Sequence, residues 1–348
     1  MTTHSRAEFT REELATVLSH YDLGTIEHIE PVTRGSRRSP KLIIRTNRGR
    51  YLLKRRAPGR DDVLKVAFAH AVQQYLAKVD FPLPRLQPTR DDGDTLLSHD
   101  GATYELFEHL PGATFDRSPD AAHDAGRILG LFHKALQDYR SEWEPPRVGY
   151  HDNESVRAAL NGIPTAISMH DSVAGRETEL LMTVTRLSEI YGQAADAVEA
   201  LDFRIWPRQI VHADWHPGNM LFVDGHVSGV IDYDSLRWQP RSMDVANGSL
   251  QFSIVGGGKD PLAWPAAADE LRLSRFLAGY ESVLTLRPQE IQVLPHLMIE
   301  ALIAEAVFPI AATGLFGRME GFRFLRMIRR KSEWIAQNER HLTALLRR

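Results

Sequence analysis

The sequence predicts an α+β protein in two parts, a sheet-rich N-terminal part followed by a larger helical part. Three segments with apolar alternation, residues 26–32, 41–46 and 50–55, are separated by turn-rich stretches, as antiparallel strands are. From residue 120 onward, apolar residues mostly recur with helical spacing instead. A chain of 348 residues is too long for one small core and suits two lobes.

Each remaining N-terminal element has its own local signal. Thr10, followed three residues later by Glu13, is typical of the capped start of a helix over residues 11–20. A helical pattern over residues 61–79 ends before two prolines, and a hairpin is predicted over residues 96–107. Strands, one helix and further strands together predict a compact antiparallel α+β unit.

The C-terminal part is predicted to be helical with one interruption, residues 209–231, where two short apolar runs flank a polar motif. The most apolar segment, residues 297–316, contains Glu300 and Glu305, which favours a buried helix over a membrane span. The hinge is expected at residues 108–112, so the predicted parts are residues 1–108 and 109–348. Helices are predicted over residues 120–139, 155–169, 177–201, 270–285, 288–312 and 321–346.

Composition excludes several classes of protein. Hydrophobic residues make up 43% and charged residues 25%, as in soluble globular proteins. The formal net charge of −3 gives no basic field to recruit nucleic acid or anionic membranes. Cysteine is absent, which excludes disulfides and thiolate metal sites and fits a reducing compartment. The first residues lack the apolar core of a signal peptide, so we expect a cytoplasmic protein.

The most informative stretch is His-Ala-Asp-Trp-His-Pro-Gly-Asn at residues 212–219, followed by Ile-Asp-Tyr-Asp at residues 231–234. Asp214 and Asn219 are five residues apart, and Asp232 follows thirteen residues later. Kinases use the same order and spacing. Asp214 is the candidate catalytic residue that accepts or orients a hydroxyl proton. Asn219 and Asp232 are the candidate Mg²⁺ ligands, because hard oxygen atoms suit this cation.

These stretches resemble the aminoglycoside phosphotransferase / choline kinase family of small-molecule kinases. The residues that carry the resemblance are Val-His-Ala-Asp-Trp-His-Pro-Gly-Asn-Met-Leu-Phe at 211–222, Gly-Val-Ile-Asp-Tyr-Asp at 229–234 and Arg-Ser-Met-Asp-Val-Ala at 241–246. Leu-Gly-Leu-Phe-His at 129–133 and the strand bearing Lys54 support it. The resemblance extends from about residue 26 to the C-terminal helices, which is nearly the whole chain.

The resemblance implies a bilobal protein-kinase-like fold and transfer of the γ-phosphoryl group of ATP, with Mg²⁺, to a hydroxyl of a small molecule. Sugar, amino-acid, amino-alcohol and aminoglycoside acceptors all remain open. No obvious Ala-Pro-Glu segment follows Asp232, so no protein-kinase activation loop is expected. In the family, the histidine at the position of His212 braces the catalytic loop. Asp244 is the second expected brace, accepting hydrogen bonds from loop amides.

Lys54 closes a strand whose alternation is expected to point its ammonium group toward nucleotide phosphates. A solvated basic edge formed with Arg55 and Arg56 is the alternative interpretation. The acidic partner expected from the following helix is missing, because residues 62–79 contain no glutamate. The side chains left as possible substitutes are those of His70, Gln73, Gln74, Asp61 and Asp62.

Further nucleotide contacts are predicted from two segments. The loop at residues 33–39 has one glycine and offers Ser36 and Arg37 to phosphates. An exposed basic hairpin is an equally good interpretation of this loop. Backbone groups from Glu105 to Phe107 are predicted to meet the adenine edge.

Acceptor-binding residues are expected from the catalytic loop and the C-terminal helices. Two glutamates on an apolar helix suggest a polar or cationic ligand, although ion pairs with nearby arginines explain them equally well. The candidates are Trp215, Asp234, Arg237, Glu300 and Glu305.

Two other classes of function stay open at this point. A non-catalytic nucleotide-binding module would share the fold but lack the chemistry. A metal-dependent hydrolase would use His212, Asp214 and His216, since imidazole suits zinc or iron.

Overall fold

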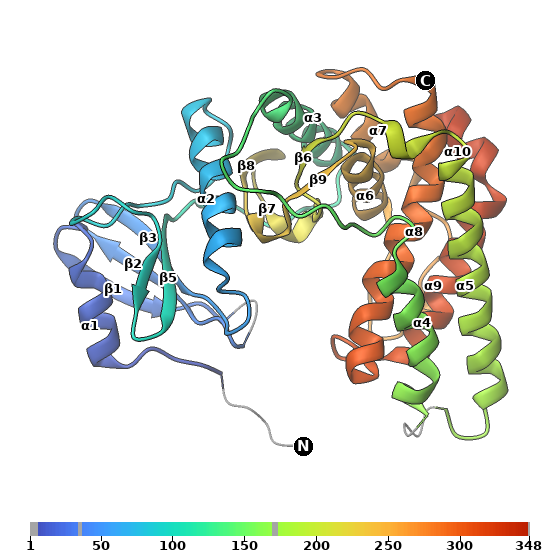
Figure 1. Cartoon of the computed structure of the whole chain (residues 1–348), viewed down its shortest axis with the longest axis horizontal. Helices are drawn as coiled ribbons and strands as arrows, with labels where there is room; N and C mark the ends of the chain where they lie inside the picture. Colours follow the sequence, from blue (N-terminus) through green and yellow to red (C-terminus); the bar gives the residue numbers. More distant parts are fainter. Residues whose placement is uncertain (1–5, 34–36, 169–172, 347–348) are drawn as a thin grey trace. The chain divides into compact units, whose positions relative to one another are not determined.

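The computed structural model describes residues 6–33, 37–168 and 173–346, and these form two compact units. One unit, the sheet unit, comprises residues 1–114, 139–145 and 220–234. The other, the helical unit, comprises residues 115–138, 146–219 and 235–348. This confirms the predicted α+β class, with an antiparallel sheet near the N-terminus and helices beyond it (Figure 1).

The sheet unit is built on a five-stranded antiparallel sheet with strand order β1-β2-β3-β5-β4. A separate two-stranded hairpin, β7–β8, completes it (Figure 1). Its elements are α1 (Arg11–Ser19), β1 (Ile26–Pro31), β2 (Lys41–Thr46), β3 (Gly49–Arg55), α2 (Val63–Lys78), β4 (Leu97–His99), β5 (Ala102–Glu108), β7 (Met220–Val223) and β8 (His226–Val230).

The two faces of the sheet differ because side chains alternate along each strand. One face carries apolar residues such as Ile44, Leu53 and Leu106, which pack with Val17 and Leu18 of α1 in one core. Residues at the intervening positions of β3 and β5 point to the opposite face. The predicted alternation of these strands thus separates an apolar core from a face that can carry charge.

The single boundary predicted at residue 108 differs from the observed division. The sheet unit continues to Thr114 and also takes in residues 220–234. Two backbone contacts explain why: Ala113 forms an antiparallel bridge with Phe222, and Val230 N–H donates to the Pro82 carbonyl. Long-range pairing of this kind leaves no signal in local sequence patterns.

The helical unit contains the remaining elements, among which α4, α5, α8 and α9 run side by side (Figure 1). Its helices and strands are α3 (Pro119–Leu136), α4 (Glu154–Ile167), α5 (Glu177–Glu199), β6 (Gln209–Val211), β9 (Arg237–Gln239), α6 (Ser242–Ser253), α7 (Glu270–Glu281), α8 (Pro288–Thr313), β10 (Leu315–Phe316), β11 (Met319–Glu320), α9 (Gly321–Gln337) and α10 (Glu339–Leu345). Short 3-10 turns, η2 (Phe203–Ile205), η3 (Pro217–Asn219) and η5 (Pro261–Ala263), join several of them. A further turn, η4 (Tyr233–Ser235), begins in the sheet unit and ends at the first residue of the next helical-unit segment.

Helix α8 is long and apolar enough to cross a membrane, yet 78% of its most apolar window is buried inside the protein. It packs against α4, α5, α6 and α9, as predicted for a core helix. Helix α6 was not predicted, because nearly all of its residues are buried and no polar face marks a helical period.

Two glycines allow α3 and α7 to approach closely. A Cβ atom at Gly126 would overlap the carbonyl of Phe276, and one at Gly279 would overlap the carbonyl of His123. The approach brings His133 of α3 within 3.0 Å of the Tyr280 hydroxyl of α7. Through Asp244, this contact supports the loop that follows β6.

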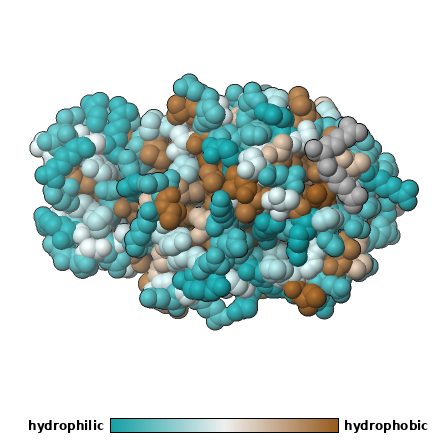
Figure 2. Space-filling view, turned by 90° about the horizontal axis from the view of Figure 1, so that it is seen from above, coloured by the Kyte–Doolittle hydropathy of each residue, from teal (hydrophilic) through white to brown (hydrophobic). Residues whose placement is uncertain are grey.

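Hydrophilic residues cover much of one face of the molecule (Figure 2). Among the described residues, large exposed apolar side chains occur on many elements, including Leu64 of α2, Met182 of α5 and Phe308 of α8. Scattered exposure of this kind is ordinary for a globular protein.

Candidate active site

The loop after β6 presents the carboxylate of Asp214, whose side chain is 36% exposed. Asn219 Nδ2 donates to Asp214 Oδ2 at 2.8 Å and to the Asp214 carbonyl at 3.1 Å. The imidazole Nε2 of His216 lies 3.6 Å from Asp214 Oδ1. Because Asn219 uses its amide nitrogen in these contacts, its Oδ1 atom is the group suited to a cation.

Asp244, at the start of α6, holds the backbone of this loop. Its two oxygens accept hydrogen bonds from the backbone N–H groups of His212 at 2.6 Å and Ala213 at 2.7 Å. Ala213 adopts a left-handed conformation with φ of 61°, so the loop needs such support. His133 Nε2 lies 3.2 Å from the same carboxylate, which links the brace to Tyr280.

His212 and Trp215 are fully buried beneath the loop. The His212 ring packs edge-on against Trp215 at 5.4 Å and against Phe132 at 5.9 Å. Trp215 was predicted to bind the acceptor, but its burial assigns it to the core instead. Within the described residues, no three His, Asp or Glu side chains converge as metal ligands. The hydrolase interpretation of His212 and His216 therefore has no structural support.

The surroundings of Asp214 favour its charged form. Burial alone would raise its pKa, but the contacts with His216, the charge of His212 and the hydrogen bond from Asn219 outweigh burial. The pKa of Asp214 consequently lies below its usual value, so the carboxylate is ionised at neutral pH and accepts hydrogen bonds.

In the sheet unit, Lys54 finds its acidic partner on the neighbouring strand. Lys54 of β3 and Glu105 of β5 are directly opposite in the ladder, so their side chains share one face. Lys54 Nζ lies 3.2 Å from Glu105 Oε2. His70 of α2 contacts the other oxygen of Glu105 at 2.8 Å. The partner is thus a strand glutamate, and His70 acts through that glutamate.

Arg56 and Asp234 complete a buried charge cluster with Lys54 and Glu105. Arg56 Nη2 donates to Glu105 Oε1 at 2.9 Å and to Asp234 Oδ1 at 2.5 Å. Asp234 Oδ2 also lies 3.7 Å from Lys54 Nζ. Asp234 was predicted to bind the acceptor, but its carboxylate is held by two cations of the sheet unit. Arg56 was not among the residues predicted to form the site.

Lys41 is a further cation on this face that local patterns did not single out. It is directly opposite Lys54 in the β2–β3 ladder. Burial lowers the pKa of Lys41, and the charge of Lys54 lowers it further. Lys41 could have been identified only from the pairing register of β2 and β3, which local sequence patterns do not give.

The other predicted nucleotide contacts fall in different places. Ser36 lies outside the described residues, and Arg37 is exposed, with its carbonyl accepting from Ala7 N–H. The Glu105–Phe107 backbone lies inside β5, with β3 on one side and the Leu86–Gln87 backbone on the other. Adenine pairing by these backbone groups stays a prediction, although most of them already have partners in the sheet.

Asp232 follows β8 at the edge of the sheet unit and adopts a left-handed conformation, with φ of 66°. This backbone state is uncommon for residues other than glycine and occurs mostly where the surroundings enforce it. A carboxylate at this position, like the amide oxygen of Asn219, belongs to the donor class that Mg²⁺ prefers.

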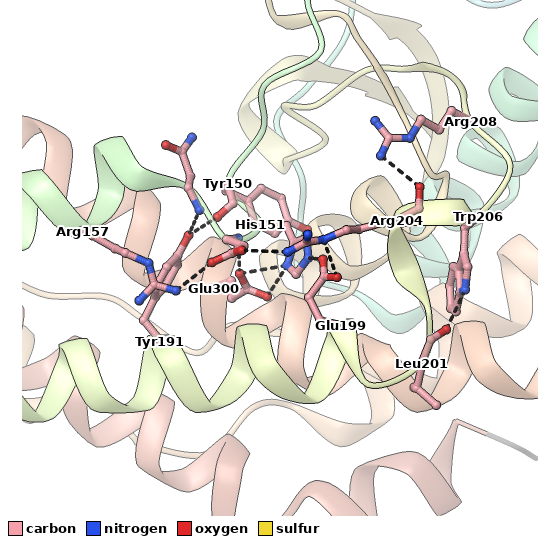
Figure 3. Close-up of polar contacts among 12 residues, drawn as sticks. Tyr150, His151, Arg157, Tyr191, Glu199, Leu201, Arg204, Trp206, Arg208 and Glu300 are labelled. Carbon is pink, nitrogen blue, oxygen red and sulfur yellow. Dashed lines mark hydrogen bonds and ion pairs between the residues drawn. The ribbon is translucent and has the colours of Figure 1, made fainter.

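Glu300 was predicted to bind the acceptor, but it lies in a buried network (Figure 3). It is fully buried, and its oxygens contact His151 Nδ1 at 2.9 and 3.1 Å and accept from Asp152 N–H at 2.9 Å. His151 Nε2 reaches Glu199 at 3.0 Å, and Glu199 pairs with Arg204 at 2.7 Å. Glu300 therefore joins α8 to the segment before α4 and to the end of α5.

Arg237 and Glu305 were the other two predicted acceptor residues. The Arg237 guanidinium donates to the backbone carbonyls of Val148, Ser235 and Leu236, which assigns it a structural role. Glu305 remains exposed, and its oxygens accept from Gln251 Nε2 at 2.8 and 2.6 Å. Although part of the Glu305 side chain is exposed, burial of its carboxylate raises its pKa to about 7, and the nearby charge of Asp214 contributes to this rise.

Known proteins resemble the chain over most of its length. Residues 28–290 match the model of the phosphotransferase enzyme family. A homoserine kinase from Sinorhizobium medicae is 25% identical over 305 residues, which cover 83% of this chain and 81% of that protein. A homoserine kinase from Xanthobacter autotrophicus is 27% identical over 297 residues, covering 82% and 80%.

Solved structures confirm the predicted protein-kinase-like fold. An aminoglycoside phosphotransferase from Alicyclobacillus acidocaldarius superposes with a TM-score of 0.67 at 16% identity, covering 99% of this chain and 98% of that one. A microcompartment-associated aminopropanol kinase gives a TM-score of 0.68 at 14% identity, covering 95% and 98%. The chain therefore belongs to the phosphotransferase enzyme family and is an ATP-dependent small-molecule kinase.

Proposed function

We propose that this kinase uses Asp214 to orient the acceptor hydroxyl and to take its proton as the γ-phosphoryl group of ATP is transferred. The hydroxyl oxygen forms a bond to phosphorus, the bond from phosphorus to the bridging oxygen breaks, and ADP leaves. The observation that carries this assignment is the geometry of Asp214, an ionised and accessible carboxylate fixed by Asn219 in a loop that Asp244 braces.

Asn219 and Asp232 are the residues proposed to hold Mg²⁺ through oxygen atoms. When bound, the cation neutralises charge on the nucleotide phosphates. Lys54 contributes a fixed positive charge for the same phosphates, and Lys41 adds a second one. Both lysines lie on one face of the sheet, where Glu105 keeps Lys54 in place.

We further propose that the acceptor carries an amino group beside its hydroxyl. Among the described residues, the contacts of Glu305 are those from the neutral amide of Gln251, and no ion pair with a cation is present. A partly desolvated carboxylate of this kind favours a cationic ligand. Relatives named homoserine kinase point the same way, so homoserine is the first acceptor to test. A cytoplasmic location is part of this proposal.

ADP release in the presence of ATP and Mg²⁺ tests the proposal, with a panel of homoserine, aminopropanol, choline, sugars and aminoglycosides. Asp214→Asn should lower turnover by about 10²–10⁴-fold while nucleotide binding persists, because it removes the proton acceptor but keeps the shape. Glu305→Gln should raise KM for amine-bearing acceptors much more than it lowers kcat. Stimulation by none of these compounds would overturn the assignment of the acceptor class.

The matched control for Asp214→Asn is Asp224→Asn, a turn residue between β7 and β8. Both substitutions remove one negative charge from a loop. Asp224→Asn should leave turnover within about twofold, since exposed substitutions away from a site change little. Equal losses in the two variants would argue that Asp214 has no specific role.

A further inference from the structure

The residue two positions after Asp232 is fixed by the sheet of its own unit. Asp234 accepts from Arg56 through both oxygens, with Nη2 at 2.5 Å and Nη1 at 3.2 Å. Arg56 is 6% exposed, and its Nη1 also donates to the Arg60 carbonyl at 2.8 Å. A two-point contact of this kind fixes direction as well as distance, because the guanidinium is planar.

Arg56 is itself held in place by Glu105. This glutamate is 1% exposed and receives Arg56 on one oxygen and Lys54 on the other. Two cations and two carboxylates therefore balance one another in a small volume. Lys54, whose side chain is 18% exposed, is the accessible cation, while the Arg56 side chain is only 4% exposed.

The same contacts limit what Asp234 can do. Both of its oxygens already face Arg56, and one also faces Lys54. A divalent cation bound to Asp234 would displace at least one of these partners. Asp232 requires support from its surroundings, because its left-handed backbone conformation is energetically costly for a residue with a side chain. Fixing Asp234, two residues on, restrains the turn in which Asp232 lies.

We propose that Arg56 and Asp234 form a clamp that positions the metal-binding turn at Asp232 on the same sheet that carries Lys54. In this proposal, Asp234 contacts neither the metal nor the acceptor and serves as a positioning residue. Glu105 holds Lys54 directly, and it holds the Asp232 turn through Arg56 and Asp234. The distance between Lys54 and the turn is therefore set without a glutamate from α2. The inference rests on the proposed function, since it takes Asp232 as the metal ligand.

Arg56→Lys and Asp234→Asn test the clamp, with calorimetry of Mg²⁺-dependent binding of a non-hydrolysable ATP analogue as the measurement. Lysine keeps the charge of Arg56 but loses the two-point contact, and asparagine keeps the shape of Asp234 but loses the charge. Each variant should raise the Mg²⁺ concentration for half-saturation by about 10–100-fold, the usual effect of losing a group that orients a metal ligand. The double variant should be no worse than the more affected single variant.

The acceptor KM, measured at saturating Mg²⁺, supplies the second readout and should stay within about twofold in both variants. Arg45→Lys is the matched control, since Arg45 lies on β2 in an exposed ion pair with Glu27 at 3.4 Å. It should leave Mg²⁺ dependence unchanged. Unfolding curves verify that each variant is folded.

An unchanged Mg²⁺ dependence in folded Arg56→Lys, together with a loss in Asp234→Asn, would overturn the clamp and make Asp234 a ligand. If Arg56→Lys does not fold, comparison of Asp234→Asn with Asp232→Asn decides. If Asp234 is a positioning residue, high Mg²⁺ should restore turnover in Asp234→Asn but not in Asp232→Asn. Restoration in neither variant would refute the positioning role of Asp234. Wild-type protein that binds no Mg²⁺-nucleotide would overturn the proposed function along with the clamp.

Discussion

The two units each bury a glutamate, and the partners of the two glutamates differ in kind. In the sheet unit, Glu105 is 1% exposed and faces two basic side chains, Lys54 and Arg56, together with the imidazole of His70. In the helical unit, Glu300 is 0% exposed and faces His151, whose charge depends on pH (Figure 3). The same residue type thus sits in two networks with different responses to protons.

The pKa shifts in the two networks have opposite signs. Burial would raise the pKa of Glu105, but Lys54, His70 and Arg56 outweigh burial and hold it far below its usual value. Burial would lower the pKa of His151, but Glu300 and Glu199 outweigh burial and raise it. Acid therefore weakens the first network and alkali weakens the second.

Removing the carboxylate of Glu105 should have the largest effect on stability. Glu105→Ala leaves the buried Arg56 and the partly exposed Lys54 with Asp234 as their remaining carboxylate, and removing one partner of a buried ion pair typically costs about 3–5 kcal/mol. Urea unfolding measures the loss. Glu108→Ala, an exposed position on the same strand, is the control and should change stability by less than about 0.5 kcal/mol. Equal effects of the two substitutions would contradict the central place of Glu105.

Neutralising Glu300 should reduce stability less than removing the Glu105 carboxylate, because its partner His151 can lose its own charge by deprotonation. Glu300→Gln should cost about 1.5–3 kcal/mol, the usual range for a hydrogen bond to a charged group. Glu189→Gln, whose ion pair with Arg186 is exposed, should cost less than about 1 kcal/mol. A loss from Glu300→Gln as large as that from Glu105→Ala would remove the distinction between the two networks.

The pH dependence of stability sharpens the comparison further. Because folding raises the pKa of His151 above 6.5, its stabilising contribution is fully present below pH 6.5 and is lost as pH rises through the folded pKa. Burial also raises the pKa of Glu300, which acts in the same direction. Hydrogen exchange of α5 and α8 should accelerate, after correction for intrinsic rates, as the pH rises above 6.5.

His151→Gln should flatten this dependence in the helical unit and leave exchange in β3 and β5 unchanged. The groups that surround the imidazole, Glu300, Glu199 and Arg204, remain in the variant. A pH dependence that survives His151→Gln would place its origin elsewhere. The slopes of wild type and variant, measured on the same peptides, decide between these outcomes.

The smallest effect is expected at Lys41, which is opposite Lys54 but has no carboxylate within ion-pair distance among the described residues. Lys41→Ala should weaken nucleotide binding by up to about fivefold, as expected for a partly solvated charge. Lys54→Ala should weaken nucleotide binding more than Lys41→Ala does. Arg45→Ala, on the same strand as Lys41, should leave nucleotide binding unchanged. A stronger effect at Lys41 than at Lys54 would reverse the assigned roles.

Local patterns predicted the elements well where one period dominates. The strands around Lys54 and the apolar helix α8 follow directly from alternation and length. Helix α6 was missed because burial on all sides removes the polar face that reveals a period. The acceptor roles of Trp215 and Glu300 stay predictions, and both side chains are fully buried, which residue type alone does not reveal.

The order and spacing of Asp214, Asn219 and Asp232 were enough to identify phosphoryl transfer, because these residues are close along the chain. Contacts between residues that are far apart along the chain became visible in the folded protein alone. Asp234 lies 178 residues from Arg56, and Glu105 lies 49 residues from it. Strand register brings Glu105 beside Lys54, whereas contacts of the β7–β8 hairpin with Ala113 and Pro82 attach the segment before Asp234 to the same unit. Both depend on pairing between distant segments rather than on any local pattern.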